Sequence, residues 1–532
     1  MKINSSKIIE VNNLEVSYPS NQFPILKNFR LEIIKKEHTA IIGSSGCGKS
    51  TLAKSLVQML PEGTKCKGNL LVDGKDPRKM NNEELQIFRR TKFGFIYQDS
   101  IKRLNPLMTV GDHLYELLKI HWRNKSKVLL QKNVKNIFNK VGIGNERLCS
   151  FPHEFSGGMR QRVCIAMALA LKPPLLIADE PTTSLDTQTS HQIMNQLLYL
   201  CKTYGSTLIL ISHDIALAAK WCKKIAIIDS GTVVEKGEIK NILNFPQSTI
   251  GKELVKSNSY KLNTNLSFNK NQELILEAIN LRCWYKLNSS ILKPKWNKAL
   301  NEVSFKLFRN ETLGIVGRSG SGKTTLGRAL IGLLKKRGGQ IKIVVNSLKN
   351  QKNKRINIAK NIQMIFQDPF SSLNPKMTIK EILEDIYLIH NQYNCNQMQK
   401  ELKSILSKLN LPYDSNFLNS YPDELSGGQL QRISIARALL IKPQILICDE
   451  SLNMLDASVK IEILYLLRKI QEDMSLSIIF ITHDLGLAKR FCNRLLVMNN
   501  GEIIEEGYSN DVFEKPKNLI TQNLLKSSLN IN

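Results

Sequence analysis

The chain of 532 residues carries one set of short motifs twice, in the same order and at almost the same spacing. Lys49 in GSSGCGKST corresponds to Lys323 in GRSGSGKTT, an offset of 323 − 49 = 274 residues. Three later pairs each have an offset of 270 residues: Ser156 and Ser426, Glu180 and Glu450, and His213 and His483. A register that stays constant over all three pairs predicts two copies of one domain, at about residues 5–240 and 272–515.

The remaining segments are predicted to be a linker and a tail. Residues 241–271 connect the two copies, and the stretch KSNSYKLNTNLSFNKNQ at their junction is polar, with little helical periodicity. Such a composition is typical of a flexible linker. Residues 516–532 follow the second copy as a C-terminal tail.

Composition narrows the class of protein. Hydrophobic residues make up 42% of the chain and charged residues 23%, which is typical of globular domains. The longest apolar stretches, such as TLILI before Ser212, are far shorter than the roughly 18 residues that a membrane helix needs, so we expect a cytoplasmic protein. The ten cysteines form no CxxC pair, which argues against a zinc or iron–sulfur site and against a disulfide framework.

The net charge of +29 leaves two interpretations open. One is a nucleic-acid partner, because positive charge alone is enough for unspecific phosphate binding. The other is biased amino-acid usage, since Lys and Arg are spread along the whole chain and Asn and Ile are also abundant. We favour the second interpretation and expect no nucleic-acid partner.

Each copy has a glycine-rich loop between a short strand pattern and a helix pattern. In such a loop the backbone N–H groups turn inward around phosphate oxygens, and the N-terminus of the following helix adds a positive dipole end. The lysine reaches the β- and γ-phosphates, and the Ser or Thr hydroxyl after it binds Mg²⁺. The predicted nucleotide-binding residues are Gly43, Ser44, Gly46, Gly48, Lys49, Ser50 and Thr51 in the first loop, and Gly317, Ser319, Gly320, Gly322, Lys323, Thr324 and Thr325 in the second.

Carboxylates follow a buried strand pattern in each copy. The apolar runs LLIADE and ILICDE are typical of parallel strands that are buried on both faces. Asp179 and Asp449 end these runs and are predicted to hold Mg²⁺. Glu180 and Glu450 come next and are candidates to polarise the attacking water. A surface position for these acids is the alternative, which the nearby phosphate loops make less attractive.

Histidine follows the next strand pattern in each copy, after TLILIS and SIIFIT. A single histidine after a strand is usually structural. Because His213 and His483 stand at matching positions, we expect them to contact the γ-phosphate.

Glutamine ends a further strand pattern, as Gln98 in FIYQDS and Gln367 in MIFQDP. Both are predicted to contact the metal and the water, and to withdraw when the adjoining loop moves. Tyr18 and Tyr285 follow an early strand pattern and are candidates to stack on adenine, with a core position as the alternative.

Residues 425–432 read LSGGQLQR and residues 155–162 read FSGGMRQR, and each stretch opens a helix pattern. Together with the phosphate loops, the DE pairs and the histidines, these stretches resemble the ATP-binding cassette (ABC) family, of which LSGGQ is the signature. The resemblance covers nearly all of both copies. It implies an α/β fold of two tandem P-loop NTPase domains, each with a mostly parallel core sheet, an antiparallel β subdomain and a helical subdomain that carries the signature.

In the ABC family two cassettes dock head to tail, so that the signature of one covers ATP held by the other. Glycine amides, a serine hydroxyl and a helix N-terminus together suit an anion. The resemblance therefore implies that the two signature turns also contact nucleotide, through Ser156, Gly157, Gly158, Ser426, Gly427 and Gly428.

Finer similarities narrow the family. LNPLMTV, SLNPKMTI and the closing GEIIEEGYSNDVFEKP look like the oligopeptide, dipeptide and nickel importer branch. This likeness implies an ATP- and Mg²⁺-dependent motor that couples hydrolysis to uptake of peptides, nickel or a metal chelate. The implied partners are two permeases and an extracytoplasmic binding protein, and the implied location is the cytoplasmic face of the inner membrane.

Two other functions are compatible with a chain of two cassettes. A soluble twin-cassette ATPase that acts on ribosomes is the first alternative, but its family typically has a long, charged helical linker. DNA repair or chromosome maintenance is the second, and it would need zinc modules or long coiled coils. The loops RLNPLMTV and SLNPKMTI favour the transporter.

The sequence departs from the ABC pattern at two methionines. Met454, in DESLNMLD, stands where the family has a small residue facing the other domain, a place that Ser184 occupies in the first copy. Met159 replaces the signature glutamine. Neither change alters the lysines, carboxylates or histidines, so we expect both sites to hydrolyse ATP.

Overall fold

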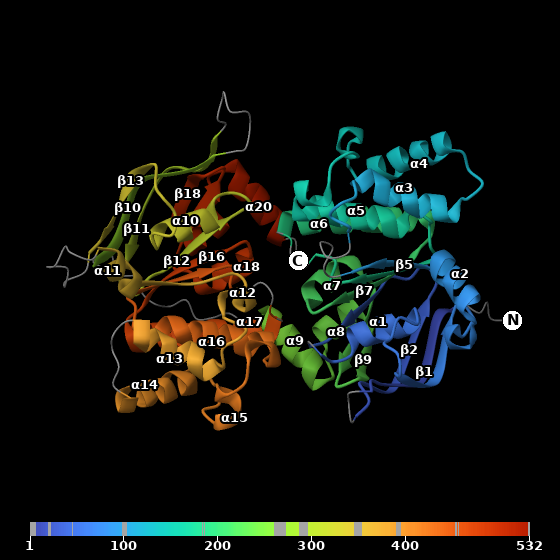
Figure 1. Cartoon of the computed structure of the whole chain (residues 1–532), viewed down its shortest axis with the longest axis horizontal. Helices are drawn as coiled ribbons and strands as arrows, with labels where there is room; N and C mark the ends of the chain where they lie inside the picture. The colour runs from blue at the N-terminus through green and yellow to red at the C-terminus, as the bar shows by residue number, and fades with distance from the viewer. Residues whose placement is uncertain are drawn as a thin grey trace. The chain divides into compact units, whose positions relative to one another are not determined.

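The computed structural model describes residues 7–19, 23–44, 46–97, 104–182, 185, 187–259, 273–286, 296–344, 354–389, 395–452, 455 and 457–529. Contacts within the chain divide it into two units. Unit 1 is formed mainly by residues up to 260 and unit 2 mainly by residues from 261 onward. Each unit is an α/β domain, as the sequence predicts (Figure 1).

The main sheet of unit 1 has six strands in the order β5-β6-β7-β3-β8-β9, of which only β9 pairs in antiparallel fashion. The strands are β3 (Thr39–Ile42), β5 (Phe93–Ile96), β6 (Leu175–Asp179), β7 (Thr207–Ser212), β8 (Lys224–Asp229) and β9 (Thr232–Glu238). All residues of β3 and β7 are buried, which explains their continuous apolar sequences. The carboxyl ends of the parallel strands meet at one edge, where the phosphate loop follows β3, Glu180 follows β6 and His213 follows β7.

A second, antiparallel sheet of unit 1 has the order β2-β1-β4. Figure 1 shows this sheet at the opposite end of unit 1 from the helices α3 and α4. Its strands are β1 (Lys7–Ser17), β2 (Leu26–Ile34) and β4 (Lys65–Val72), and the helical elements nearest to it in sequence are α1 (Lys49–Leu56), η1 (Pro77–Lys79) and α2 (Asn82–Lys92). One apolar cluster joins this sheet to α1 and the main sheet, so the phosphate loop is anchored between two sheets.

The rest of unit 1 is helical. A second apolar cluster joins α3, α4 and α5 to the main sheet, and Phe138 of α4 is fully buried in it. The elements are α3 (Val110–His121), α4 (Lys127–Lys140), η3 (Asn145–Arg147), η4 (Pro152–Glu154), α5 (Gly157–Leu169), α6 (Thr187–Tyr204), α7 (Ile215–Trp221), α8 (Ile239–Asn244) and α9 (Thr249–Ser259).

Unit 2 repeats this plan. Its main sheet has the order β14-β15-β16-β12-β17-β18, again with only the last strand antiparallel, and its small sheet has the order β11-β10-β13. The strands are β10 (Leu274–Lys286), β11 (Trp296–Phe308), β12 (Thr312–Gly317), β13 (Gly338–Ile343), β14 (Ile362–Ile365), β15 (Ile445–Asp449), β16 (Ser477–Thr482), β17 (Arg494–Asn499) and β18 (Glu502–Tyr508). Identical strand order confirms the prediction of two copies of one fold.

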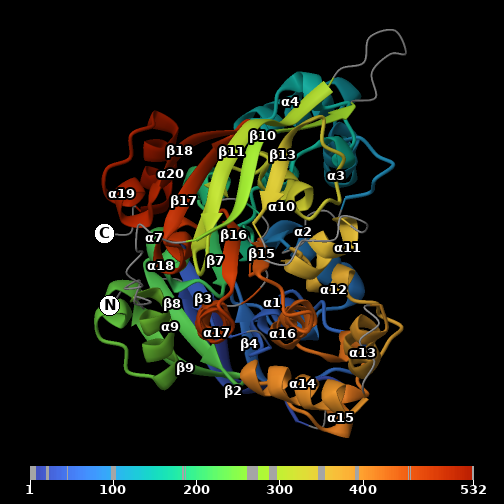
Figure 2. The ribbon, with the colours of Figure 1, turned by 90° about the vertical axis from the view of Figure 1, so that its left-hand side faces the viewer.

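The helices of unit 2 are arranged largely as those of unit 1 are. Figure 2 shows α13, α14 and α15 grouped at one end of the unit, away from the small sheet β11-β10-β13. The elements are α10 (Lys323–Leu330), α11 (Lys354–Asn361), α12 (Pro369–Ser372), α13 (Ile379–Ile389), α14 (Cys395–Lys408), α15 (Ser415–Leu418), η6 (Pro422–Glu424), α16 (Gly427–Leu439), α17 (Ala457–Met474), α18 (Leu485–Phe491), α19 (Ser509–Glu514) and α20 (Leu519–Leu529).

The structure differs from the sequence-based borders after residue 240. Helix α9 lies within the range assigned to the linker, and its Ile250 and Leu254 pack against the core of unit 1. Helix α20 lies within the range assigned to the tail, and its Leu524 and Leu525 are buried. Apolar side chains at helical spacing explain both helices, whose polar flanks hide them in the sequence. The last part of the linker, residues 260–271, lies outside the described residues.

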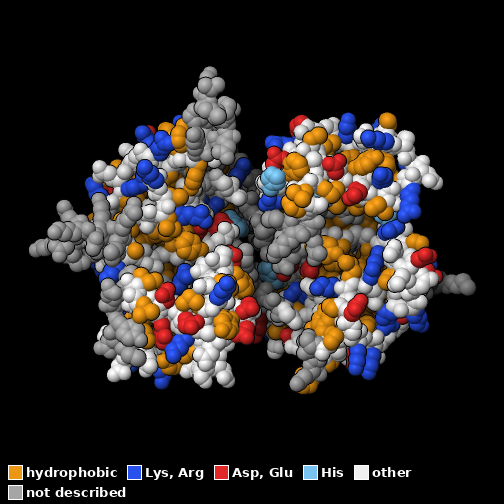
Figure 3. All heavy atoms as spheres, viewed as in Figure 1, with side chains coloured by type: hydrophobic (Ala, Val, Ile, Leu, Met, Phe, Trp, Pro, Cys, Tyr) orange, Lys and Arg blue, Asp and Glu red, His pale blue; other side chains and the backbone are white. Residues whose placement is uncertain are grey.

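Charge is dispersed over the surface. On the face drawn in Figure 3, Lys and Arg side chains alternate with acidic, apolar and neutral polar side chains over both units. A continuous basic stripe, the usual mark of a nucleic-acid site, does not run across this face. Within the part of the chain that the structure describes, no helix combines the length and apolar character needed to cross a membrane.

Candidate functional site

The phosphate loop of unit 1 connects β3 to α1. Gly48 is the N-cap of α1 and has φ 106°, a left-handed conformation that side chains disfavour. Gly43 lies so close to β8 that an added Cβ would stand 2.3 Å from the carbonyl oxygen of Ile228. Glycine is therefore required at both positions, once for backbone conformation and once for space.

The loop of unit 2 has the same geometry. Gly322 is the N-cap of α10 with φ 102°, and an added Cβ at Gly317 would stand 2.3 Å from the carbonyl oxygen of Met498. The second glycines of the two loops, Gly46 and Gly320, have φ 78° and 80°, and an added Cβ there would meet no atom within 4 Å. Each loop thus has open space beside its second glycine, which leaves room for a phosphate group to approach the backbone.

The loop lysines are buried and held by the loops themselves. The Nζ atom of Lys49 donates hydrogen bonds to the carbonyl oxygens of Gly43 (2.8 Å) and Ser44 (2.7 Å). Lys323 is bound in the same way by Gly317 (3.0 Å) and by the residue after it (2.9 Å). Each ammonium group is therefore fixed inside the curve of its loop.

A hydroxyl and a carboxylate meet beside each loop. Ser50 Oγ donates to Asp179 at 3.0 Å in unit 1, and Thr324 Oγ1 donates to Asp449 at 3.1 Å in unit 2. Burial raises the pKa of Asp179 although the bond from Ser50 lowers it. Burial likewise raises the pKa of Asp449, to about 6. A carboxylate that is partly buried in unit 1 and buried in unit 2, next to a hydroxyl, is a hard oxygen donor set whose charge a divalent cation would stabilise, so these residues fit Mg²⁺.

The glutamates after these aspartates face the predicted histidines. The Oε1 atom of Glu180 lies 2.9 Å from Nδ1 of His213. The corresponding atoms of Glu450 and His483 are 3.5 Å apart. The structure thus brings each predicted base next to the histidine of the same unit, at the carboxyl edge of the sheet.

Both glutamates have a left-handed backbone, which the sequence did not indicate. Glu180 and Glu450 each have φ 46°, and their N–H groups donate to Ile211 and Ile481 at 2.9 Å. A non-glycine residue in this region carries strain of the order of 1 kcal/mol, and such residues cluster at functional sites. A glutamate that follows an aspartate at a strand end would have been the only sequence signal for this turn.

Glu450 has two further neighbours in unit 2. Gln367 Nε2 donates to its Oε2 atom at 3.1 Å, and Nζ of Lys323 lies 3.8 Å from its Oε1 atom. Gln367 is therefore brought to the predicted base. Its counterpart Gln98 lies outside the described residues, as do Ser184 and Met454.

The predicted adenine-stacking tyrosines differ in their surroundings. Tyr18 follows β1, and its hydroxyl lies 3.2 Å from Oγ1 of Thr51 on α1, so it stands beside the phosphate loop. Tyr285 lies on β10 and is 40% exposed. Tyr18 therefore has a direct contact with the helix that follows the first phosphate loop. In the corresponding helix of unit 2, Thr325 follows Thr324 in the first turn of α10.

The two signature turns form the N-termini of α5 and α16. Ser156 caps α5 by accepting from the N–H of Met159 at 3.4 Å. Ser426 caps α16 in a reciprocal capping box, in which Gln429 Oε1 also accepts from the N–H of Ser426 at 3.0 Å. Met159 cannot make this return bond, so the first signature turn has one capping hydrogen bond fewer.

Packing alone already explains the second glycine of each signature turn. Gly157 and Gly427 open the helices, and the residues after them face a neighbouring helix. An added Cβ at Gly158 would stand 2.5 Å from Thr189 on α6. At Gly428 it would stand 3.1 Å from Val459 on α17. Only glycine allows α6 to pack this closely against the first signature turn.

A glycine-rich loop between a parallel strand and a helix, with an aspartate and a glutamate at the end of another parallel strand of the same sheet, defines a P-loop nucleotide hydrolase. The family described as ABC transporter matches residues 26–183 and 300–453. The chain belongs to the ABC transporter family and is an ATPase with two cassettes.

Curated relatives extend over both units. The peptidoglycan transport ATP-binding protein YejF of Agrobacterium fabrum is 32% identical over 99% of this chain and 97% of its own length. An uncharacterized ABC transporter ATP-binding protein, YejF of Escherichia coli, is 34% identical over 98% of this chain and 99% of its own length. The glutathione import ATP-binding protein GsiA of Escherichia coli is 32% identical over 98% of this chain and 90% of its own length.

Proposed function

We propose that this ATPase is the motor of an importer that takes up short peptides or peptide-like compounds. The observation that carries the proposal is similarity to a glutathione import protein and a peptidoglycan transport protein along both cassettes and the connection between them. The oligopeptide, dipeptide and nickel branch, inferred from the sequence, points the same way. Nickel or a metal chelate is the competing cargo.

We assign the chemistry of each site to residues of one unit. In unit 1, Lys49 binds the β- and γ-phosphates, and Ser50, Asp179 and Gln98 hold Mg²⁺. Bound Mg²⁺ would neutralise charge that develops on the phosphates. Glu180 polarises the attacking water, and His213 contacts the γ-phosphate. The 2.9 Å contact of His213 with Glu180 supports these last two roles.

Unit 2 has the same assignments. Lys323 binds the phosphates, Thr324, Asp449 and Gln367 hold Mg²⁺, Glu450 is the base and His483 contacts the γ-phosphate. These positions are supported by the hydrogen bonds from Thr324 to Asp449 and from Gln367 to Glu450.

The signature turns are proposed to act on the nucleotide of the other unit. Ser426 and Gly428 would cover ATP bound at Lys49, and Ser156 and Gly158 would cover ATP bound at Lys323. This pairing follows from membership of the ABC family. A chain with Ser426→Arg should retain ATP binding at Lys49 yet lose most of its turnover. Full turnover in this variant would contradict the pairing.

The proposed partners are two permease subunits and an extracytoplasmic binding protein, with the ATPase held peripherally at the cytoplasmic face of the membrane. A groove of about 360 Å³ in unit 1, between β5, α3 and α5, supports a docking place for a permease helix. Its lining is mostly apolar, and Tyr97 and Leu104 border the segment that holds Gln98. Leu107, three residues beyond Leu104, is 85% exposed. A helix docked here could therefore act directly on the glutamine loop.

The docking place can be tested with Leu107→Asp. This variant should lose co-purification with the permeases while its ATPase activity in solution stays unchanged. Val128→Asp, at a position that is 76% exposed on α4, is the matched control and should still co-purify. Undiminished capture of Leu107→Asp would place the permease elsewhere.

The transport function can be tested by uptake in cells that lack this gene. We expect uptake of a radiolabelled tripeptide to fall, to recover with the wild-type gene, and not to recover with Glu180→Gln combined with Glu450→Gln. Uptake of ⁶³Ni²⁺ should stay unchanged. A loss confined to nickel would replace the peptide assignment, and no loss of either would remove import as the function.

A further inference from the structure

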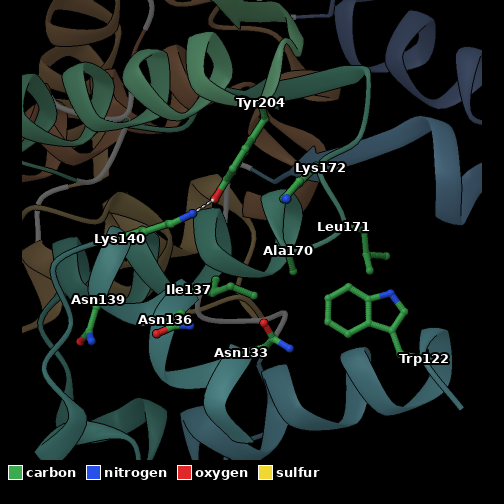
Figure 4. Close-up of a pocket in the computed structure, with 10 residues that line it drawn as sticks. All are labelled: Trp122, Asn133, Asn136, Ile137, Asn139, Lys140, Ala170, Leu171, Lys172 and Tyr204. Carbon is green, nitrogen blue, oxygen red and sulfur yellow. Dashed lines mark hydrogen bonds between the residues drawn. The ribbon is translucent and has the colours of Figure 1, made fainter. Parts of the chain in front are cut away.

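A pocket in the helical part of unit 1 lies outside the phosphate loop and its carboxylates. It has a volume of about 380 Å³, in the range of small-molecule sites, and is formed by the end of α3, one face of α4, and the ends of α5 and α6 (Figure 4). In Figure 4, Trp122, Ile137 and Leu171 lie around the hollow, with the amide of Asn133 beside them. The pocket thus offers an aromatic ring, apolar walls and an amide.

Two lysines stand together at this pocket. Lys140 Nζ donates to the hydroxyl of Tyr204 at 3.2 Å and lies 5.1 Å from the centre of its ring. Lys172 Nζ lies 5.6 Å from the same ring centre. Both lysine side chains are exposed, and neither forms an ion pair with an acidic side chain among the residues that the structure describes. Among the described side chains, both ammonium groups instead face the ring of Tyr204.

Unit 2 has the same two lysines but neutralises both. Helix α4 reads QKNVKNIFNK where α14 reads QKELKSILSK, so Lys140 corresponds to Lys408 and Asn133 to Glu401. Lys408 forms an ion pair with Asp473 at 2.9 Å. The counterpart of Lys172 is Lys442, which pairs with Glu401 at 2.6 Å.

The acids of unit 2 are missing from unit 1 at the matching positions. Glu401 is replaced by Asn133, and Asp473 is replaced by Thr203. Met474 is replaced by Tyr204, whose ring faces both lysines. Unit 1 therefore keeps the two cations, loses both counter-ions and gains an aromatic ring, and these changes together are what an anion-binding pocket requires.

We propose that this pocket binds a small planar organic anion. The ring of the ligand would lie against Trp122, and its phosphate or carboxylate would lie between Lys140 and Lys172. The amide of Asn133 would hydrogen-bond to a polar edge of the ring. This site is separate from ATP hydrolysis and belongs to unit 1 alone.

The proposal can be tested by calorimetric titration of the full chain with 1-naphthyl phosphate, 1-naphthoate and the uncharged 1-naphthamide. The decisive variant is Asn133→Glu with Thr203→Asp, which introduces the ion pairs of unit 2 without disturbing the apolar core. Lys132→Glu is the matched control, because it changes the charge of an exposed residue on α4 outside the pocket. The phosphate and carboxylate probes distinguish the two kinds of anion.

We expect one of the anionic probes to bind to about one site per chain, and the uncharged probe to bind about tenfold more weakly. The double variant should weaken anion binding about tenfold, and Lys132→Glu should leave it within about twofold. Equal affinity in the wild type and the double variant would overturn the proposal, since it would place the probe at the phosphate loops or elsewhere. Equal binding of the neutral and anionic probes would overturn it as well.

Discussion

The two units share their strand order and motif geometry, yet one ion pair that supports the sheet is partly exposed in unit 1 and largely buried in unit 2. In unit 1, Lys224 and Glu37 pair at 3.1 Å near the surface, where their side chains are 38% and 25% exposed. In unit 2 the corresponding Arg494 and Glu311 pair at 2.7 Å, and the Glu311 side chain is completely buried. Arg494 also binds Glu506.

This difference shows which parts of the repeat can vary. The phosphate loops keep the same lysine contacts and glycine conformations, because small shifts there would move the reacting groups. The ion pair lies beside the core strand that precedes the phosphate loop, which is β3 in unit 1 and β12 in unit 2. The pair is solvated in unit 1 and buried in unit 2, although both strands hold the same position in their sheets. The two units therefore differ in an ion pair that supports the sheet and agree in the geometry of the phosphate loop.

The largest effect is expected at the two glutamates that we propose to polarise the attacking water. Changing both Glu180 and Glu450 to Gln should lower ATP turnover about 10²–10⁴-fold while nucleotide binding persists, because a general base is lost. Phosphate release and nucleotide binding would be measured on the same preparations. The two single variants sharpen the comparison, because each shows how much of the turnover depends on the glutamate of one unit. Unchanged turnover in the double variant would remove both carboxylates from the mechanism.

The ion pairs should differ strongly in their contribution to stability. Arg494→Ala leaves a buried carboxylate without its partner and should lower the free energy of unfolding by about 3–5 kcal/mol at pH 8. Lys224→Ala breaks the solvated pair and should cost about 1 kcal/mol or less. Denaturant unfolding, with both variants compared in one buffer, measures the difference. Equal losses would mean that burial does not distinguish the two pairs.

The loop lysines compare the two sites directly. Lys49→Ala and Lys323→Ala should each remove tight binding at one site, so that about half of the nucleotide bound by the wild type remains. Equilibrium dialysis with labelled ATP measures this quantity. Full binding in either variant would argue against the assignment of that loop. The combined variant should bind almost no nucleotide.

Stability should depend on pH through Glu311. Burial raises its pKa to about 7, although Arg494 and the N–H of Phe308 lower it. Because the pKa of Glu311 in the folded state exceeds the usual value of 4.5, the folded chain binds this proton more tightly than the unfolded chain. The stabilisation that comes from the protonated carboxyl is therefore complete below pH 4.5 and is lost as the pH rises through 7. Relative to Glu311→Gln, the wild type should lose at most about 1.4 kcal/mol per pH unit over this window. A constant difference between wild type and variant would contradict the shift.

The smallest effect is expected at the signature turns. Met159→Gln should complete a capping box like that of Ser426 and stabilise the chain by about 1 kcal/mol or less. Gln429→Met should remove the box from unit 2 and cost a similar amount. Calorimetry of both variants measures these changes. If neither variant changes the unfolding temperature, the return hydrogen bond does not contribute to helix stability.

The sequence predicted the local parts of this fold well. LLIADE and ILICDE are the parallel strands β6 and β15, and the phosphate-loop helices begin at Lys49 and Lys323 as the motif implies. These predictions succeed because each depends on a short run of residues. The sequence also named Glu180 and His213 without showing that they touch, since 33 residues separate them.

Features that depend on distant contacts could not be predicted. Glu311 and Arg494 are 183 residues apart in sequence, so nothing local distinguishes them from a surface pair. Helix α9 was missed because its few apolar residues become meaningful only against the core that they cover. The unpaired lysines of unit 1 likewise emerge only when their spatial neighbours in both units are known.

The left-handed backbone at Glu180 and Glu450 sets the stability of the protein against its activity. Glycine or asparagine would fit φ 46° with less tension and should make the protein harder to unfold. Under the role proposed for these glutamates, the same replacement would stop ATP hydrolysis at that site. A single substitution should therefore give a more stable chain in which one cassette no longer hydrolyses ATP.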